Sequence, residues 1–328
     1  MPDPFQCSIA LLASFLASSS AVAGSQWVLR ARTHRLANPI GIFALAAGLV
    51  AGLSVLRFEV TWPPANAINR FLTIVLPGAV VVELILGLTV TTTVPVRHFK
   101  SVGLLSVVAL ILRFGLFAAV GRILLHNSVY LSSTSGSADE ISSWLTAALL
   151  IVGVVLPGVT WNLLRNVADR DVPASIVVSL SMSIMTAGLA IMLAGYIGGG
   201  VAAIPVAASL MGTVAISPWI CRGSRAWHDQ YFTGIMGVGL IALYGLLWIG
   251  YFFGQLTAIN SIVIFVAPLL CWISELPVFR EMTGRRKVVL RLMVVAIPLL
   301  MLLLLAKQTF DQKLAPLMAD SSPFPSGI

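Results

Sequence analysis

Residues 232–254 read FTGIMGVGLIALYGLLWIGYFFG and contain no charged side chain. About 20 apolar residues in a helix cross the roughly 30 Å hydrocarbon core of a bilayer, and a helix pairs its own backbone groups. This stretch therefore predicts a transmembrane helix. The whole chain has the same character, since 58% of its 328 residues are hydrophobic, 10% are charged and the mean hydropathy is +0.98. Because soluble domains carry about 25% charged residues, this composition excludes a soluble globular enzyme and a disordered chain.

Ten stretches of suitable length and hydropathy predict an all-α, polytopic membrane protein. We expect these spans at about 7–29, 39–56, 71–93, 101–125, 143–164, 173–196, 200–220, 232–254, 259–279 and 287–306. The connections between them are too short to form a hydrophobic core of their own. The sequence therefore predicts a single integral-membrane helical bundle over residues 1–306, followed by a short polar tail, 307–328.

Basic residues gather at one end of these spans, as the positive-inside rule requires. The segments after odd-numbered spans contain Arg30, Arg32, Arg35, Arg97, Lys100, Arg165, Arg170, Arg222, Arg225, Arg280, Arg285, Arg286 and Lys287. We therefore expect these segments in the cytoplasm and both termini on the non-cytoplasmic side of a cell (inner or plasma) membrane. The formal net charge of +8 is then a topology signal rather than a nucleic-acid-binding patch. The basic run at 285–287 predicts contact with anionic lipid at the cytoplasmic face.

An alternative exists for the first span. The triplet Ala21-Val22-Ala23 follows an apolar run and has the small-residue pattern of a signal-peptide cleavage site. No Lys or Arg precedes that run, and the arginines after it favour its retention as a helix. Cleavage would leave nine spans.

Prolines inside the spans suggest breaks in some helices. The tetrapeptide Val-Leu-Pro-Gly occurs at 75–78 and again at 155–158, and the seventh and ninth spans contain Pro205 and Pro268. Broken helices are typical of transporter binding sites, where freed backbone groups bind substrate or ions. Proline is also tolerated in membrane helices as a simple kink that shapes packing, so both interpretations stay open.

Glu83 and Arg113 are the ionisable residues deepest inside the spans, and Glu275 lies shallower in the ninth span. A buried charge costs about 2.5–3.5 kcal/mol even on the lenient insertion scale, so each needs a partner or a function. Glu83 and Arg113 fall near the midplane of two spans joined by a short connection. They predict either an intramembrane ion pair that joins these helices or a water-accessible cavity for a charged or polar solute. Glu275 lies nearer the cytoplasmic end, where solvation or pairing with Arg280 is one interpretation and membership of the same cavity is the other.

Other polar residues could line such a cavity. We include Asn162 among the candidate pathway residues, together with its neighbours Thr160 and Trp161 and the hydroxyls of the sixth span. Those hydroxyl residues are Ser179, Ser181, Ser183 and Thr186. Small hydroxyl residues also permit close helix packing. The pairs Gly48/Gly52, Gly195/Gly199 and Gly250/Gly254 have the spacing of helix-packing glycines, and 198–200 predicts a tight turn between the sixth and seventh spans.

The sequence contains no recognisable enzyme motif. Metalloprotease, serine-hydrolase and phosphate-binding signatures are absent, and the Gly237-Val238-Gly239 triplet lies in an apolar span without a preceding strand. The four histidines are isolated, and the three cysteines have neither disulfide nor zinc spacing. Ser137 and Glu140 have the spacing of a capping box ahead of the fifth span, so helix capping is the simpler account of the acidic pair Asp139-Glu140. We therefore expect no catalytic residue, no metal and no cofactor.

Two functions fit these observations best. The first is a secondary transporter or permease for a small polar or charged solute, which would use the intramembrane charges near the midplane. The second is a non-catalytic structural or assembly subunit of a membrane complex, which would bind another membrane protein. An intramembrane enzyme is the third interpretation and has the least support. The expected partners are the bilayer, a small solute and a membrane protein, with no nucleic acid.

Overall fold

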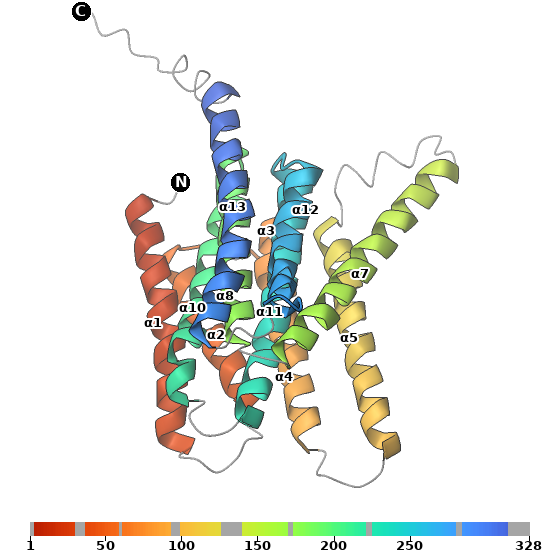
Figure 1. The fold of residues 1–328 in the computed structure, drawn as a ribbon. Helices are drawn as coiled ribbons and strands as arrows, with labels where there is room; N and C mark the ends of the chain where they lie inside the picture. Colours follow the sequence, from red (N-terminus) through yellow and green to blue (C-terminus); the bar gives the residue numbers. More distant parts are fainter. Residues whose placement is uncertain are drawn as a thin grey trace, which may run out of the picture.

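The structure is a computed structural model that describes residues 3–29, 37–58, 61–92, 99–125, 140–169, 173–220, 225–279 and 284–313. These residues form helices and contain no strand (Figure 1). In chain order the helices are α1 (Pro4–Leu29), α2 (Ala37–Val55), α3 (Ala67–Arg70), η2 (Phe71–Val75), α4 (Leu76–Thr92), α5 (Phe99–Leu125), α7 (Glu140–Ala168), α8 (Ala174–Leu193), α9 (Ile197–Val201), α10 (Ala203–Ile220), α11 (Arg225–Phe253), α12 (Ala258–Val266), η4 (Ala267–Glu275) and α13 (Arg285–Lys313).

Within the described residues, nine helical segments are long and apolar enough to cross a membrane. They match nine of the ten expected spans, so the prediction of a helical membrane protein is confirmed. The remaining expected span, 143–164, falls in α7, a helix of 29 residues. The side chains of 141–152 lie outside the described part, and the count of ten therefore stays a prediction.

The helices run side by side between two ends of the molecule (Figure 1). We call the end at which α1 begins and α13 ends the upper end, as it is drawn in Figure 1. The start of the first helix and the end of the last helix therefore lie at the same end of the molecule, which an even number of crossings requires. Which side of the membrane the upper end faces stays a prediction.

Helix α11 is the centre of the bundle. It packs against α2, α4, α5, α7, α8 and α12, and 89% of an 18-residue window within Tyr231–Phe253 is buried. By contrast, only 22% of the corresponding window in α13 is buried, because this helix lies at the periphery. A helix that is apolar all round suits both positions in a bilayer, where its outer surface meets lipid and its inner surface meets protein.

Glycine allows α1, α2 and α10 to pack closely. A Cβ atom on Gly48 would lie 2.7 Å from the backbone oxygen of Ser14 and 2.7 Å from Oγ of Ser209. A Cβ atom on Gly52 would overlap Oγ of Ser14. The predicted packing role of the Gly48/Gly52 pair is therefore confirmed.

Two predictions for the region after α8 are wrong: the helix-packing role of the Gly195/Gly199 pair and the tight turn at 198–200. Gly195 has open space around its Cα and a φ of +96°, so it ends α8 in a conformation that glycine adopts without strain. The turn therefore comes earlier, and Gly198–Gly200 belong to the short helix α9. Gly200 instead packs against the backbone of Gly188 in α8.

Two of the four expected helix breaks appear as irregular helical geometry. The third span contains a π-helical segment, η2, which ends two residues before Pro77. The ninth span changes from α12 to the 3-10 helix η4 at Ala267, directly before Pro268. Pro157 lies within α7 with no such change in geometry. Pro205 lies in the first turn of α10, three residues after the turn at Ala202 that separates α9 from α10, so the seventh span is interrupted there as well. Because proline has no N–H and blocks the α-helical pattern, it explains where η2 and η4 occur.

Candidate functional site

Glu83 in α4 and Arg113 in α5 form a two-pronged ion pair in the interior. Nε of Arg113 donates to Oε1 of Glu83 at 2.7 Å, and Nη2 donates to Oε2 at 2.7 Å. The side chains are 0% and 8% exposed. Both carboxylate oxygens thus have a charged donor, which is the strongest geometry for such a pair. The predicted intramembrane ion pair is confirmed.

Neighbouring helices enclose this pair. The guanidinium carbon of Arg113 lies 4.2 Å from the ring centroid of Trp161 in α7, within cation–π range. On the other side, a Cβ atom on Gly237 of α11 would overlap Oε1 of Glu83. The pair therefore links four helices, α4, α5, α7 and α11, and the backbone of α11 covers the carboxylate.

Glu275 belongs to a second ionic cluster, at the junction of η4 and α13. Its Oε1 lies 2.8 Å from Nζ of Lys287 and 2.8 Å from Nη2 of Arg291. Arg291 is only 1% exposed, and Nε of this residue donates to Oγ of Ser274 at 2.7 Å. Nη1 of Arg291 donates to Oγ of Ser175 at 3.0 Å. The cluster therefore joins η4, α13 and α8.

The observed partners of Glu275 differ from those considered from the sequence. Arg280 lies outside the described residues. Glu275 contacts Lys287 and Arg291, while Glu83 contacts Arg113, so the three charges do not form one cavity. The spacing of Lys287 and Arg291 is the one signal in the sequence for this cluster. The two residues are four positions apart and therefore share one face of α13.

A row of small residues, four of which carry a hydroxyl group, follows one face of α8 above this cluster. Its members are Ser175, Ser179, Ser183, Thr186 and Ala190. At 3.6 residues per turn they fall within about 80° of the helix circumference. We call this row the α8 stripe. Ser181 is not part of it, because its hydroxyl points to α10 and donates to the backbone oxygen of Ala207 at 2.8 Å.

The contacts of the α8 stripe show which elements it faces. Ser175 accepts from Arg291 of α13, and Ser179 accepts from the thiol of Cys271 in η4 at an Oγ–Sγ distance of 3.6 Å. Ser183 is 0% exposed, and its hydroxyl has no hydrogen-bond partner among the described residues. A buried hydroxyl without a partner costs free energy, so the stripe contains an unused hydrogen-bonding group.

A cavity of about 560 Å³ lies at the upper end of the same three segments. We call it the upper cavity. Its lining comes from the end of α8, from the start of α12 with the preceding connection, and from the last turns of α13: Ala190, Leu193, Ala194, Gln255, Leu256, Thr257, Asn260, Leu305, Ala306, Thr309 and Phe310. Between this cavity and the ionic cluster, the buried face of α13 is apolar, with Val295, Leu299 and Leu302.

Asn162 is exposed on α7. Its neighbour Trp161 is the residue that contacts Arg113. Thr160 is 1% exposed, and its hydroxyl has no partner among the described residues. Trp272 of η4 donates from Nε1 to the backbone oxygen of Leu163 at 3.1 Å, which attaches the ninth span to α7.

Within the described residues, no three His, Cys, Asp or Glu side chains are grouped so that they could hold a metal ion. Comparison with known proteins found no matching model of a protein family, no matching curated protein and no matching solved structure.

Proposed function

We propose that this protein is a secondary transporter, in the cell membrane, that carries a small polar or charged solute along the α8 stripe. The observation that carries this proposal is an alignment of three features. The upper cavity and the Glu275 cluster lie at opposite ends of the same segments, α8, α12–η4 and α13, and the hydroxyls of the α8 stripe lie between them. Ser175 and Ala194 are separated by about 28 Å at 1.5 Å per residue, which is close to the thickness of the hydrocarbon core.

In this proposal, the present arrangement is one state of an alternating-access cycle. The upper cavity provides an entry, while the ion pairs of Glu275 with Lys287 and Arg291 close the lower end. Opening that end requires η4 and α13 to separate. The carboxylate sits at the end of a 3-10 helix, whose hydrogen bonds have poorer geometry than those of an α-helix, so this span costs less to rearrange.

In this proposal the two buried clusters have different roles. Both carboxylate oxygens of Glu83 accept a hydrogen bond from Arg113, and four helices enclose the pair. We therefore assign these two residues a structural role in holding the bundle together. Glu275 lies on the pathway and acts as part of the lower closure. Asn162 lines neither the upper cavity nor the α8 stripe, and we give it no role in transport.

The test is solute flux in proteoliposomes. Vesicles with and without the protein are exposed to glycerol, mannitol, glycine, glutamate, lactate and potassium phosphate, and shrinkage and recovery are followed by light scattering. We expect faster recovery with at least one of these solutes. If every solute crosses protein-containing and protein-free vesicles at the same rate, the proposal is wrong.

A blocking experiment locates the route. Thr309 lines the upper cavity, whereas the neighbouring Gln308 is exposed and does not. In a background without Cys7 and Cys221, a bulky maleimide attached to Thr309→Cys should reduce flux several-fold. The same reagent on the matched control, Gln308→Cys, should leave it unchanged. Equal inhibition of both variants would contradict the proposed route.

The second candidate is a non-catalytic subunit of a membrane complex. It is favoured by α13, which has a long apolar face exposed on the outside of the bundle, including Met293, Ile297, Met301 and Leu304. Such a face meets either lipid or another membrane protein. Absence of flux together with co-purification of a stoichiometric membrane partner would support this candidate instead.

A further inference from the structure

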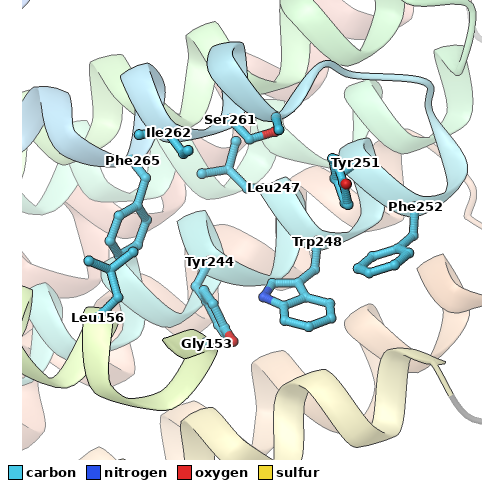
Figure 2. Close-up of a pocket in the computed structure, with 11 residues that line it drawn as sticks. Gly153, Leu156, Tyr244, Leu247, Trp248, Tyr251, Phe252, Ser261, Ile262 and Phe265 are labelled. Atoms are coloured by element: carbon cyan, nitrogen blue, oxygen red, sulfur yellow. The ribbon is translucent and has the colours of Figure 1, made fainter. Parts of the chain in front are cut away.

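A second pocket lies on the other side of α12, between α7, α11 and α12, and the proposed solute route does not use it. It has a volume of about 250 Å³. Figure 2 shows that aromatic rings from α11 and α12 form much of its wall. We call it the aromatic pocket, and its lining is Gly153, Leu156, Tyr244, Leu247, Trp248, Tyr251, Phe252, Ala258, Ser261, Ile262 and Phe265.

The rings of this pocket support one another. Trp248 and Phe252 are stacked with centroids 5.0 Å apart and planes inclined by 23°. Tyr244 meets Trp248 edge to face at 5.8 Å and Phe265 at 6.4 Å. Such pairs prefer these arrangements, so the walls resist collapse into the empty space.

Glycine in α7 sets the floor of the pocket. A Cβ atom on Gly153 would lie 2.8 Å from the hydroxyl oxygen of Tyr244 and 3.1 Å from the ring of Trp248. In Figure 2 the Tyr244 side chain points to this glycine. The tyrosine hydroxyl is thus held against the α7 backbone, and the space above it is surrounded by hydrocarbon.

Water is a poor occupant of this space. The hydroxyl of Ser261 already donates to the backbone oxygen of Thr257 at 3.2 Å, and the remaining lining is almost entirely apolar. An apolar cavity of about 150 Å³ in a protein stays dry and accepts a benzene-sized ligand. The aromatic pocket is larger than that, so its natural occupant is a hydrocarbon group.

The position of the pocket identifies the source of that group. Tyr251 and Ala258 lie near the upper end of the bundle, and Phe265 is seven residues further along α12, or about 10 Å deeper. This depth falls within the upper leaflet of a bilayer whose core is roughly 30 Å thick. Four lining residues are also exposed at the surface: Ala258, Leu156 at 43%, Tyr251 at 46% and Ile262 at 57%. The pocket therefore opens sideways to lipid.

We propose that the aromatic pocket binds one acyl chain of a phospholipid from the upper leaflet. The chain enters between α7 and α12 and packs against Trp248 and Phe265. This inference is independent of transport, because none of its residues lines the upper cavity or belongs to the Glu275 cluster.

The test uses a phosphatidylcholine with a photoreactive diazirine near the end of one acyl chain. The protein is reconstituted with increasing fractions of this lipid, irradiated and digested, and the labelled peptides are identified by mass spectrometry. We expect labelling of the peptides that contain Trp248 and Phe265 to saturate at a low lipid fraction. Labelling that rises linearly at every position would show ordinary contact with bulk lipid and would overturn the proposal.

Two variants fill the pocket from different helices. Ala258→Phe and Leu156→Phe place a ring at its mouth, and each should lower the saturable labelling several-fold. The matched control is Ile259→Phe, because Ile259 is 73% exposed next to Ala258 but does not line the pocket. Thermal melting of each variant separates loss of the site from loss of the fold. Unchanged labelling in two folded filling variants would also overturn the proposal.

A third arm replaces the phospholipid with a polyprenyl phosphate that carries the same diazirine. Since both molecules present an aliphatic chain, this arm distinguishes the source of the ligand. Saturable labelling by the phospholipid supports the proposal. Saturable labelling by the polyprenyl phosphate alone contradicts the assignment to a phospholipid acyl chain.

Discussion

Arg113 illustrates how a single charge becomes stable inside a membrane protein. Nε and Nη2 of its guanidinium each donate a hydrogen bond of 2.7 Å to a carboxylate oxygen of Glu83. The ring of Trp161 lies against the guanidinium. A lysine could provide only one point of positive charge and could not form the same forked contact. Removing either partner leaves the other charge buried without its match, which is more costly than removing both.

The ion pair therefore makes a sharp prediction for stability. We expect Glu83→Gln and Arg113→Gln each to lower the free energy of unfolding by about 3–5 kcal/mol, because each leaves an uncompensated buried charge. The double variant should lose clearly less than the sum of the two. Thermal unfolding in one detergent measures all three.

Arg122→Gln is the matched control for this cycle. Arg122 lies on the same helix, α5, but is exposed, so its replacement should change stability by no more than about 0.5 kcal/mol. Two small and additive single effects would instead show that the pair contributes little to stability, and its role as a structural contact would then be wrong.

At the level of the helices, packing depends on where glycine faces a neighbouring backbone. Gly48 faces α1 and α10, where no space remains for a methyl group. Gly115 in α5 is also in mid-span, yet nothing lies within 4 Å of the position its Cβ would occupy. The two residues look alike in the sequence, and only their surroundings differ.

This difference predicts opposite effects of the same substitution. Gly48→Ala should destabilise the protein by about 1–3 kcal/mol, because the added methyl group forces α1 and α10 apart. Gly115→Ala should be neutral or stabilise by up to about 1 kcal/mol, because alanine favours the helix and meets no atom. Chemical or thermal unfolding in detergent measures both. A similar loss in the two variants would mean that the close approach of these helices is not what Gly48 provides.

The irregular spans show how much local geometry proline sets. The π-helical segment precedes Pro77, the 3-10 helix begins next to Pro268, and α10 begins two residues before Pro205, directly after a turn, whereas Pro157 leaves its helix regular. Proline residues therefore marked candidate positions for breaks but not which of them would occur. The outcome depends on whether neighbouring helices accommodate the displaced backbone.

At the level of the whole molecule, the start of α1 and the end of α13 lie together at the upper end (Figure 1). The excess of arginine in the opposite connections predicts that the upper end faces away from the cytoplasm.

Cysteine labelling tests this orientation. In a background without Cys7 and Cys221, we expect Asp3→Cys and Gln312→Cys to react with a membrane-impermeant maleimide on intact cells. Asn166→Cys, which is exposed at the lower end of α7, should react only after permeabilisation. Reaction of Asn166→Cys alone on intact cells would reverse the orientation, and different results for positions 3 and 312 would exclude an even number of crossings.

The amino-acid sequence was sufficient for those properties that each segment carries independently. Apolar runs of about 20 residues specify membrane-crossing helices because the bilayer supplies the same constraint to every one of them. The rarity of charge inside these runs also singled out Glu83 and Arg113 as partners. The tertiary structure alone decided which faces meet. It separated Glu275 from that pair, joined it to Lys287 and Arg291, and divided the hydroxyls of α8 between α10 and the proposed route. In lipid, nearly every helix face is apolar, so hydropathy cannot select between neighbours, and the choice depends on shape complementarity between side chains far apart in the sequence.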